Sequence, residues 1–154
     1  VRMIAQRDVQ RQYLALAHGR WEGRGPRDVH AAIGRDPRNR LRMAVLDPNQ
    51  TGAKDARTTI ELLDGNAQHC LVRCSLHTGR THQIRVHMAS IGHPLVGDVT
   101  YGGSAGAAIG RQALHAFRLA LAHPVNGRSL EFRAPLPADM RQAVTQVGLR
   151  YNPA

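Results

Sequence analysis

The sequence predicts an α+β domain built on a mixed, mainly antiparallel sheet with flanking helices. Three observations predict it: apolar residues recur at every second position in several segments, only two segments carry a helical repeat, and an Asn-Gly pair separates two apolar runs. Alternation with a period of two is typical of strands, and many strands with few helices favour an antiparallel sheet. With 154 residues and 42% hydrophobic composition, the chain can bury the core of one domain.

The expected strands follow one another between loops rich in turn-forming residues. Residues 20–28 (RWEGRGPRD) are expected to form a loop, and residues 47–52 (DPNQTG) a turn. The pair Asn126-Gly127 favours positive φ and predicts a tight hairpin. The strands are expected at residues 13–17, 41–46, 58–62 and 70–76, and on either side of the hairpin at Leu119/Leu121 and Leu130/Phe132.

Two helices are expected. In residues 81–91, Thr81 can cap the helix, Gly92 can end it, and a stripe of apolar side chains should turn into the core. The second helix is expected at residues 138–147. The apolar stripes are Ile84, Met88 and Ile91 in the first helix, and Met140, Val144 and Val147 in the second.

The charge of the chain predicts a polyanionic partner. The net charge is +10, from 21 basic and 11 acidic residues, and the two halves carry +5 each, so the excess is not confined to a tail. Such a surface favours nucleic acid because neutralised phosphates release counterions. The alternative is a basic protein from a genome rich in arginine codons. No run of eighteen apolar residues occurs, so no membrane span is expected.

The cysteines and histidines predict neither a disulfide nor a metal site. Cys70 and Cys74 are too few for a disulfide framework, which favours a cytoplasmic location. A zinc site made of these two cysteines with His77 and His82 was weighed. Residues four apart on a strand are separated by about 13 Å, too far for one tetrahedral ion. No metal and no cofactor are therefore expected.

The start of the first helix is a candidate anion site. Unpaired backbone N–H groups at a helix N-terminus attract anions, and Arg80 precedes this one. His82 and Arg85 lie three residues apart and share its polar face, and the arginine fork suits phosphate or carboxylate. The alternative is a solvated helix face.

A known family shares these motifs. The segment TGRTHQIRVHMA, followed by IGHPLVGD and YGG within residues 75–103, resembles the third signature region of RluA-type pseudouridine synthases. The segments YLAL (13–16), QALHA (112–116) and APLP (134–137) resemble other parts of the family in the same order. The resemblance runs from about residue 6 to residue 140 and is specific because the longest match is nearly continuous.

The resemblance implies a function and a fold. The family isomerises uridine in RNA to pseudouridine without a cofactor, here in large-subunit ribosomal RNA, and has the pseudouridine synthase catalytic fold. Its catalytic aspartate lies in a motif of the form HRLDxxTSG, which this sequence does not contain. Residues 1–154 are therefore expected to be the C-terminal portion of one catalytic domain, incomplete at the N-terminus and inactive alone. The alternatives are a non-catalytic RNA-binding module of the same fold and a metal-dependent hydrolase built on the histidines.

The resemblance also implies roles for two catalytic residues. Arg85 would pair with the aspartate of the HRLD motif, and Tyr13 would contact the uracil. Both should then face one open cleft. With that aspartate absent from the sequence, Arg85 should be partly exposed or paired with another acid. Without the family, Tyr13 would be a strand residue of the core and Arg85 a surface helix residue.

Four further residues receive RNA-binding roles from the resemblance. Arg80, His82 and Gln83 would line the RNA side of the cleft, and Leu114 would pack against the base. Leu114 could equally be a plain core leucine. Asp98, which follows a glycine, is expected to cap or close a turn.

Overall fold

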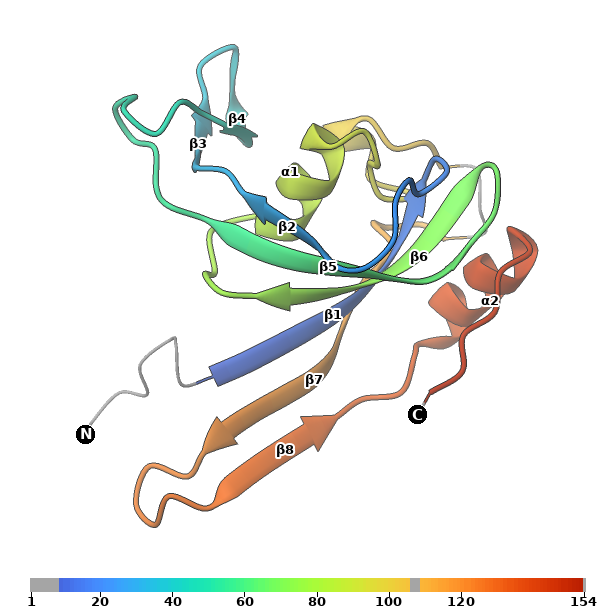
Figure 1. Ribbon diagram of the computed structural model, residues 1–154. Helices are drawn as coiled ribbons and strands as arrows, with labels where there is room; N and C mark the ends of the chain where they lie inside the picture. The colour runs from blue at the N-terminus through green and yellow to red at the C-terminus, as the bar shows by residue number, and fades with distance from the viewer. Residues whose placement is uncertain (1–8, 106–108, 154) are drawn as a thin grey trace.

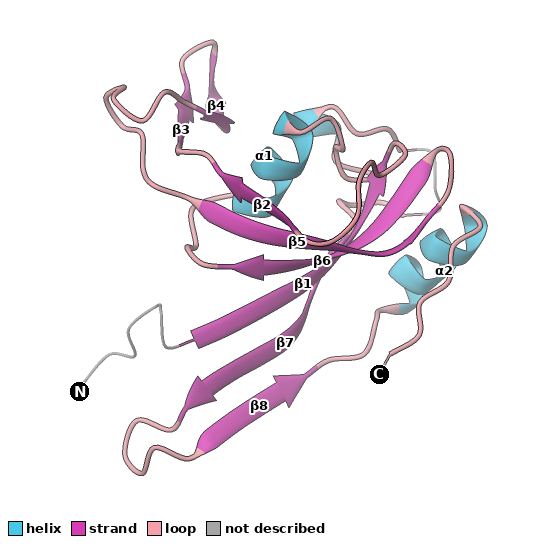
Figure 2. Cartoon of the chain, viewed as in Figure 1, coloured by secondary structure: helices cyan, strands magenta, loops and turns pink. Residues whose placement is uncertain are grey.

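A six-stranded sheet runs through the molecule, with one helix on each face and a separate hairpin beside it (Figures 1 and 2). The structure is a computed structural model and describes residues 9–105 and 109–153. No helix in these ranges is long and apolar enough to cross a membrane. The elements are β1 (Val9–His18), β2 (Arg27–His30), β3 (Ile33–Asp36), β4 (Asn39–Val45), β5 (Arg57–Gly65), β6 (His69–Leu76), α1 (Gln83–Ser90), the 3₁₀ helix η2 (Val99–Tyr101), β7 (Leu114–Ala122), β8 (Ser129–Arg133) and α2 (Ala138–Gln146).

The strand order in the main sheet is β2-β5-β6-β1-β7-β8, and each neighbouring pair is antiparallel. Strands β3 and β4 form the separate antiparallel hairpin. The predicted α+β class with a mainly antiparallel sheet is confirmed. The pairings in the described ranges include no parallel pair, so the sheet is less mixed than predicted.

The two faces of the sheet bury different clusters, and β1 divides them by simple alternation. Leu14 and Leu16 belong to the cluster under α2, whereas Ala15 and Ala17 belong to the cluster under α1. We call these the α2 face and the α1 face. The α2 face is closed by Met140, Ala143 and Val144 of α2, and the α1 face by Ile84 and Met88 of α1.

Both cysteines lie on the α1 face as buried free thiols. Burial raises the pKa of the Cys70 and Cys74 thiols to about 12. They are therefore inert packing residues, as the sequence predicted.

The first helix is shorter than predicted, and its cap was predicted wrongly. Thr81 does not cap it, because the N-cap residue is His82 in a left-handed conformation (φ 55°) without a side-chain cap bond. The expected core stripe is confirmed, with Ile84 and Met88 buried and Ile91 half-buried. Gly92 follows the helix with φ 89°, as expected of a terminating glycine.

The sequence missed the two short strands β2 and β3. Strand β2 begins inside the expected 20–28 loop, and Val29 is its only buried residue. It forms by pairing with β5 along the sheet edge, which leaves no hydrophobic repeat to detect. The hairpin between β7 and β8 is confirmed, but its connection spans residues 123–128 and only Gly127 in it has positive φ, so the turn is not the tight one predicted.

Candidate active site

The loop before α1 is held from inside by Gln83. This first residue of the helix is 3% exposed. Its Oε1 accepts hydrogen bonds from Thr78 Oγ1 (2.7 Å) and the Arg80 backbone N–H (3.0 Å). Its Nε2 donates to the Arg57 carbonyl (3.0 Å) and Thr58 Oγ1 (2.9 Å). With its amide engaged by protein groups, Gln83 fixes the path of the chain into α1.

His82 takes its left-handed conformation next to Tyr101. The two rings meet edge to face, and His82 Nδ1 lies 2.8 Å from the Tyr101 hydroxyl. That hydroxyl also accepts a hydrogen bond from the Met43 backbone N–H at 3.0 Å, and its proton and second lone pair suit Nδ1 in either ring tautomer. Burial and then the nearby Arg85 lower the pKa of His82, which favours the neutral ring.

Arg85 forms a paired interaction with Asp98. Arg85 Nε donates to Asp98 Oδ2 (2.8 Å) and Nη2 to Oδ1 (2.9 Å), with side-chain exposures of 13% and 1%. The hydrogen bonds that Arg85 donates to Asp98 are the main cause of the raised pKa of Arg85. The expectation that Arg85 pairs with another acid is therefore confirmed. The sequence did not identify Asp98 as that acid.

A tight turn places Asp98 opposite Arg85. The Asp98 carbonyl accepts from the N–H groups of Tyr101 (3.2 Å) and Gly103 (2.8 Å), so the expected turn is confirmed. A Cβ atom on Gly103 would collide with the Leu95 carbonyl oxygen, which explains a glycine here. The Asp98 side chain makes no cap bond to η2 and is free for Arg85.

Among residues 9–105 and 109–153, these contacts leave the outer edge of the Arg85 guanidinium without a carboxylate partner. Asp98 uses the Nε edge, and the Cζ atom lies 5.0 Å from the centroid of the Tyr101 ring. A guanidinium has five N–H donors in a fixed plane. The outer edge, formed by Nη1 and Nη2, can therefore bind a second carboxylate or a phosphate in the same plane.

Tyr13 and Leu114 lie on the α1 face. Tyr13 is half-buried in β1, and Leu114 is half-buried at the start of β7. Both pack against the cluster that contains Ile84 and Met88 of α1. The structure thus joins Tyr13, Leu114 and the apolar side of α1, while the described contacts of Arg85 run to η2. A cleft shared by Arg85 and Tyr13 stays a prediction.

Comparison with known proteins decides the family. The family model described as RNA pseudouridylate synthase matches residues 1–90, more than half of the chain. This chain belongs to that family. The ribosomal large subunit pseudouridine synthase D of Nitrosomonas europaea is 49% identical over 147 residues, which cover 90% of this chain and 41% of that protein. An uncharacterized RNA pseudouridine synthase of Chloroflexus aurantiacus is 46% identical, covering 92% of this chain and 43% of that protein.

Solved structures agree. The human RNA pseudouridylate synthase domain containing 1 superposes with a TM-score of 0.71 and 32% identity, over 84% of this chain and 56% of that one. The human RNA pseudouridylate synthase domain containing 4 has a TM-score of 0.73 at 20% identity, over 95% of this chain and 65% of that one, and shows the fold alone. The chain spans less than half the length of the curated pseudouridine synthases that it matches.

The sequence missed an arginine-rich hairpin next to this site. Four arginines fall within residues 35–42 of the β3–β4 hairpin, which projects from the sheet (Figure 1). Arg42 binds Asp36 (2.8 Å) and the Thr100 carbonyl (3.2 Å), which ties the hairpin to η2. Arg38 and Arg40 are exposed. The run RDPRNRLR indicates this basic surface in the sequence, but its charges entered the prediction only through the net charge of the chain.

Arg80 lies at the same end of the site. Its side chain is half-buried, and its Nε donates to the Asp55 carbonyl at 2.7 Å. A group of three or more potential metal ligands is not found within residues 9–105 and 109–153. His77 contacts Thr59 and His82 contacts Tyr101. These histidines therefore do not form a zinc site with Cys70 and Cys74.

Behind the site, the buried His87 should make stability depend on pH. Its Nδ1 lies 2.8 Å from Thr58 Oγ1, its Nε2 lies 2.8 Å from the Ala31 carbonyl, and the residue has no exposed surface. Because the Ala31 carbonyl can only accept, Nε2 carries a proton, and Nδ1 of the neutral ring accepts from the Thr58 hydroxyl, which itself accepts from Gln83. Burial lowers the pKa of His87.

The unfolded chain therefore binds a proton at higher pH than the folded chain does. The free energy of unfolding should be fully retained above pH about 6.5 and fall as pH decreases below that value. Urea unfolding between pH 7.5 and 5 measures this slope. His87→Gln, which cannot be protonated, should flatten it, and exposed His77→Gln should not. An equal slope in the parent and His87→Gln proteins would contradict the assignment.

Proposed function

We propose that this chain is the C-terminal portion of one catalytic domain of an enzyme that isomerises uridine to pseudouridine in large-subunit ribosomal RNA. The observation that carries the proposal is the Arg85 guanidinium, oriented by Asp98 along one edge and by Tyr101 at one face. It lies inside the segment that resembles the family's third signature region, and relatives named ribosomal large subunit pseudouridine synthase D match 90% and 91% of the chain.

The reaction needs positioning rather than a cofactor. The bond between N1 of uracil and the sugar C1′ breaks, the base turns, and C5 bonds to the same C1′. C5 loses its proton to solvent, and N1, which carries no proton while it is bonded to the sugar, gains one, so atoms and electrons balance. The outer edge of Arg85 would hold the attacking carboxylate ionised and aimed. The 154 residues contain no HRLD motif, so the proposal concerns this chain together with a segment that carries one.

The remaining site residues would have two kinds of role: four would contact the RNA, and one would position the chain around them. Tyr13 and Leu114 would contact the uracil from the sheet. Arg80 and His82 would face the RNA at the start of α1. Gln83, 3% exposed, would act from inside as a positioning residue, because its amide is bonded to protein groups.

The partner is RNA, and the surface that supports this lies beside the site. Arg38 and Arg40 are exposed on the β3–β4 hairpin, and Leu41, which follows Arg40, is 89% exposed. Phosphate contacts of this kind fix the register of RNA without reading its sequence. The buried free thiols of Cys70 and Cys74 support a reducing compartment, and we place the protein in the cytoplasm.

Tritium release from RNA labelled at uridine C5 tests the function, because C5 loses its hydrogen when it bonds to C1′. We expect release by the chain joined to its HRLD-bearing segment. We expect none by the 154 residues alone or when the motif aspartate is changed to alanine, since buffer cannot replace a positioned carboxylate. Release by the 154 residues alone at the rate of the joined protein would overturn this account.

A non-catalytic RNA-binding module is the second candidate. It is favoured by the Arg85–Asp98 pair, in which the arginine already has a carboxylate partner. The joined protein and the 154 residues alone also distinguish an enzyme from a non-catalytic RNA-binding module. If the joined protein binds RNA with steep salt dependence but releases no tritium, the module is the correct assignment.

A further inference from the structure

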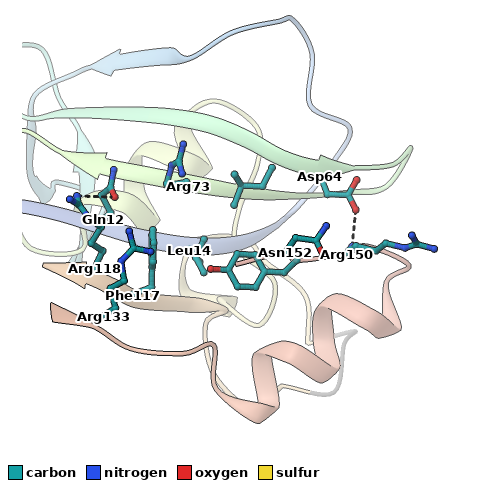
Figure 3. A pocket seen from close by; sticks show the side chains of 11 residues that line it. Gln12, Leu14, Asp64, Arg73, Phe117, Arg118, Arg133, Arg150 and Asn152 are labelled. Atoms are coloured by element: carbon teal, nitrogen blue, oxygen red, sulfur yellow. Dashed lines mark hydrogen bonds between the residues drawn. The ribbon is translucent and has the colours of Figure 1, made fainter. Parts of the chain in front are cut away.

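An unexplained cavity lies on the α2 face, across the sheet from Tyr13. This cavity of about 620 Å³ opens between β5, β6, β1 and β7 on one side and the chain that follows α2 on the other (Figure 3). Four arginines and one acidic residue, Asp64, line it, together with the rings of Phe117 and Tyr151. The arginines are Arg73, Arg118, Arg133 and Arg150.

Two β-bulges build its walls. Between β1 and β7 the register shifts so that Gln12 pairs with Arg118 and Tyr13 with Ala116, which leaves Phe117 extra. Regular alternation would send Phe117 and Arg118 to opposite faces, but here both line the cavity. In β5 a second shift leaves Leu63 extra, and Leu63 and Asp64 line the opposite wall. Bulges that aim consecutive side chains at one hollow are typical of binding sites.

The chain after α2 closes the cavity and is tied to the sheet. The Arg150 backbone N–H donates to Asp64 Oδ2 at 2.7 Å, as Figure 3 shows, and Asn66 Nδ2 donates to the Val147 carbonyl at 2.8 Å. Leu149 is 5% exposed in the core beneath. The wall that carries Tyr151 is therefore part of the folded structure.

The arginines keep donors for a ligand. Arg73 Nη2 binds Glu61 at 2.9 Å, but the buried Arg73 Nε has no hydrogen-bond partner within the described ranges. Such an atom calls for an explanation, because buried donors are nearly always bonded. Arg118 is 20% exposed, and its bonds to Gln12 and Glu131 are long, at 3.4 Å each. An anion could replace these bonds by shorter, charge-assisted ones.

We propose that this cavity binds one nucleotide of an RNA strand, with the phosphate on Arg118 and Arg73 and the base against Phe117 and Tyr151. Guanidinium forks match phosphate, and aromatic rings stack on any base. A free phosphate would use the arginines alone, whereas a nucleotide would also contact Phe117 and Tyr151, which are only partly buried against the core cluster under α2. This second RNA contact rests on the proposed function only in taking RNA as the partner. It lies on the opposite face from α1, so RNA that reaches both sites must pass round an edge of the sheet.

NMR titration of the 154-residue chain with uridine 5′-monophosphate tests the proposal without any modification activity. We expect the amide signals of Phe117, Arg118 and Tyr151 to shift, and inorganic phosphate to bind more weakly. Tyr151→Leu, which keeps an apolar side chain, should weaken nucleotide binding about tenfold by removing the stack. Arg118→Ala should reduce the salt slope of RNA binding by about one, and Arg128→Ala, in the exposed β7–β8 connection, should leave the nucleotide shifts unchanged.

The outcomes separate this inference from the proposed function. If phosphate binds as tightly as the nucleotide, the cavity is an anion site and the nucleotide proposal is wrong. If the cavity signals stay fixed while RNA shifts the α1 and hairpin signals, the proposal is wrong and the proposed function stands. If an acidic peptide shifts the cavity signals and the nucleotide does not, the cavity is a protein-docking site.

Discussion

Replacing Asp98 by alanine should lower the free energy of unfolding by about 3 kcal/mol, the lower end of the cost of stranding one buried charge. The carboxylate is 1% exposed and makes two short bonds to Arg85, which is itself 13% exposed. Without Asp98, the Arg85 guanidinium must either stay buried as an unpaired charge or move out into solvent. Either change disturbs the turn over α1. Urea unfolding measures the loss as a lower midpoint at constant slope.

The chain offers a matched control on its surface. Asp139 binds Arg111 in the same paired geometry, at 3.0 and 3.1 Å, but the two side chains are 41% and 39% exposed. Asp139→Ala should therefore cost no more than about 1 kcal/mol, since solvent screens an exposed pair. Equal losses for Asp98→Ala and Asp139→Ala would mean that burial does not set the strength of the Arg85 pair.

Local patterns were enough to predict most strands of the sheet. The strand at residues 13–17 was expected from the sequence, whereas the division of its side chains between the two faces appears only in the structure. The apolar stripe of α1 was also expected from the sequence. Local patterns fail where pairing supplies the stability. Strand β2 buries one side chain and exists because β5 offers it an edge.

The candidate site was predictable as a list of residues but not as a geometry. Arg85 could be named from its motif, whereas its pairing with Asp98 depends on a turn that returns the chain over α1. The resemblance placed Gln83 on the RNA side of the cleft, whereas its side chain is 3% exposed and bonded to protein groups. Only the fold shows that the carbonyl and hydroxyl groups of β5 and the loop before α1 surround it.

The cavity on the α2 face was invisible for a related reason. Its residues come from six separate parts of the chain, and the two bulges that aim them break the alternation by which strands are recognised in a sequence. A bulge leaves no mark in composition, because any residue can be the extra one. Phe117 and Arg118 would therefore be assigned to opposite faces from sequence alone.

In the complete synthase, Arg85→Lys should reduce turnover by roughly 100-fold although the positive charge is kept. Lysine is a point charge on a flexible stem and cannot bind Asp98 along one edge while presenting a second planar edge to another carboxylate. If the proposed roles hold, with Arg85 orienting the reacting group and the hairpin and cavity arginines binding RNA, the loss should fall on kcat with KM little changed. Tritium release at saturating RNA measures it.

Arg128→Lys is the control for the same chemical change in an exposed loop, and its turnover should match the parent. Urea unfolding of Arg85→Lys separates lost stability from lost chemistry, because a variant that stays folded at the assay temperature must owe its slower turnover to geometry. Near-parental turnover in Arg85→Lys would remove Arg85 from the catalytic residues. A raised KM with kcat unchanged would instead make Arg85 a phosphate contact, with its outer edge turned to RNA rather than to the reacting carboxylate.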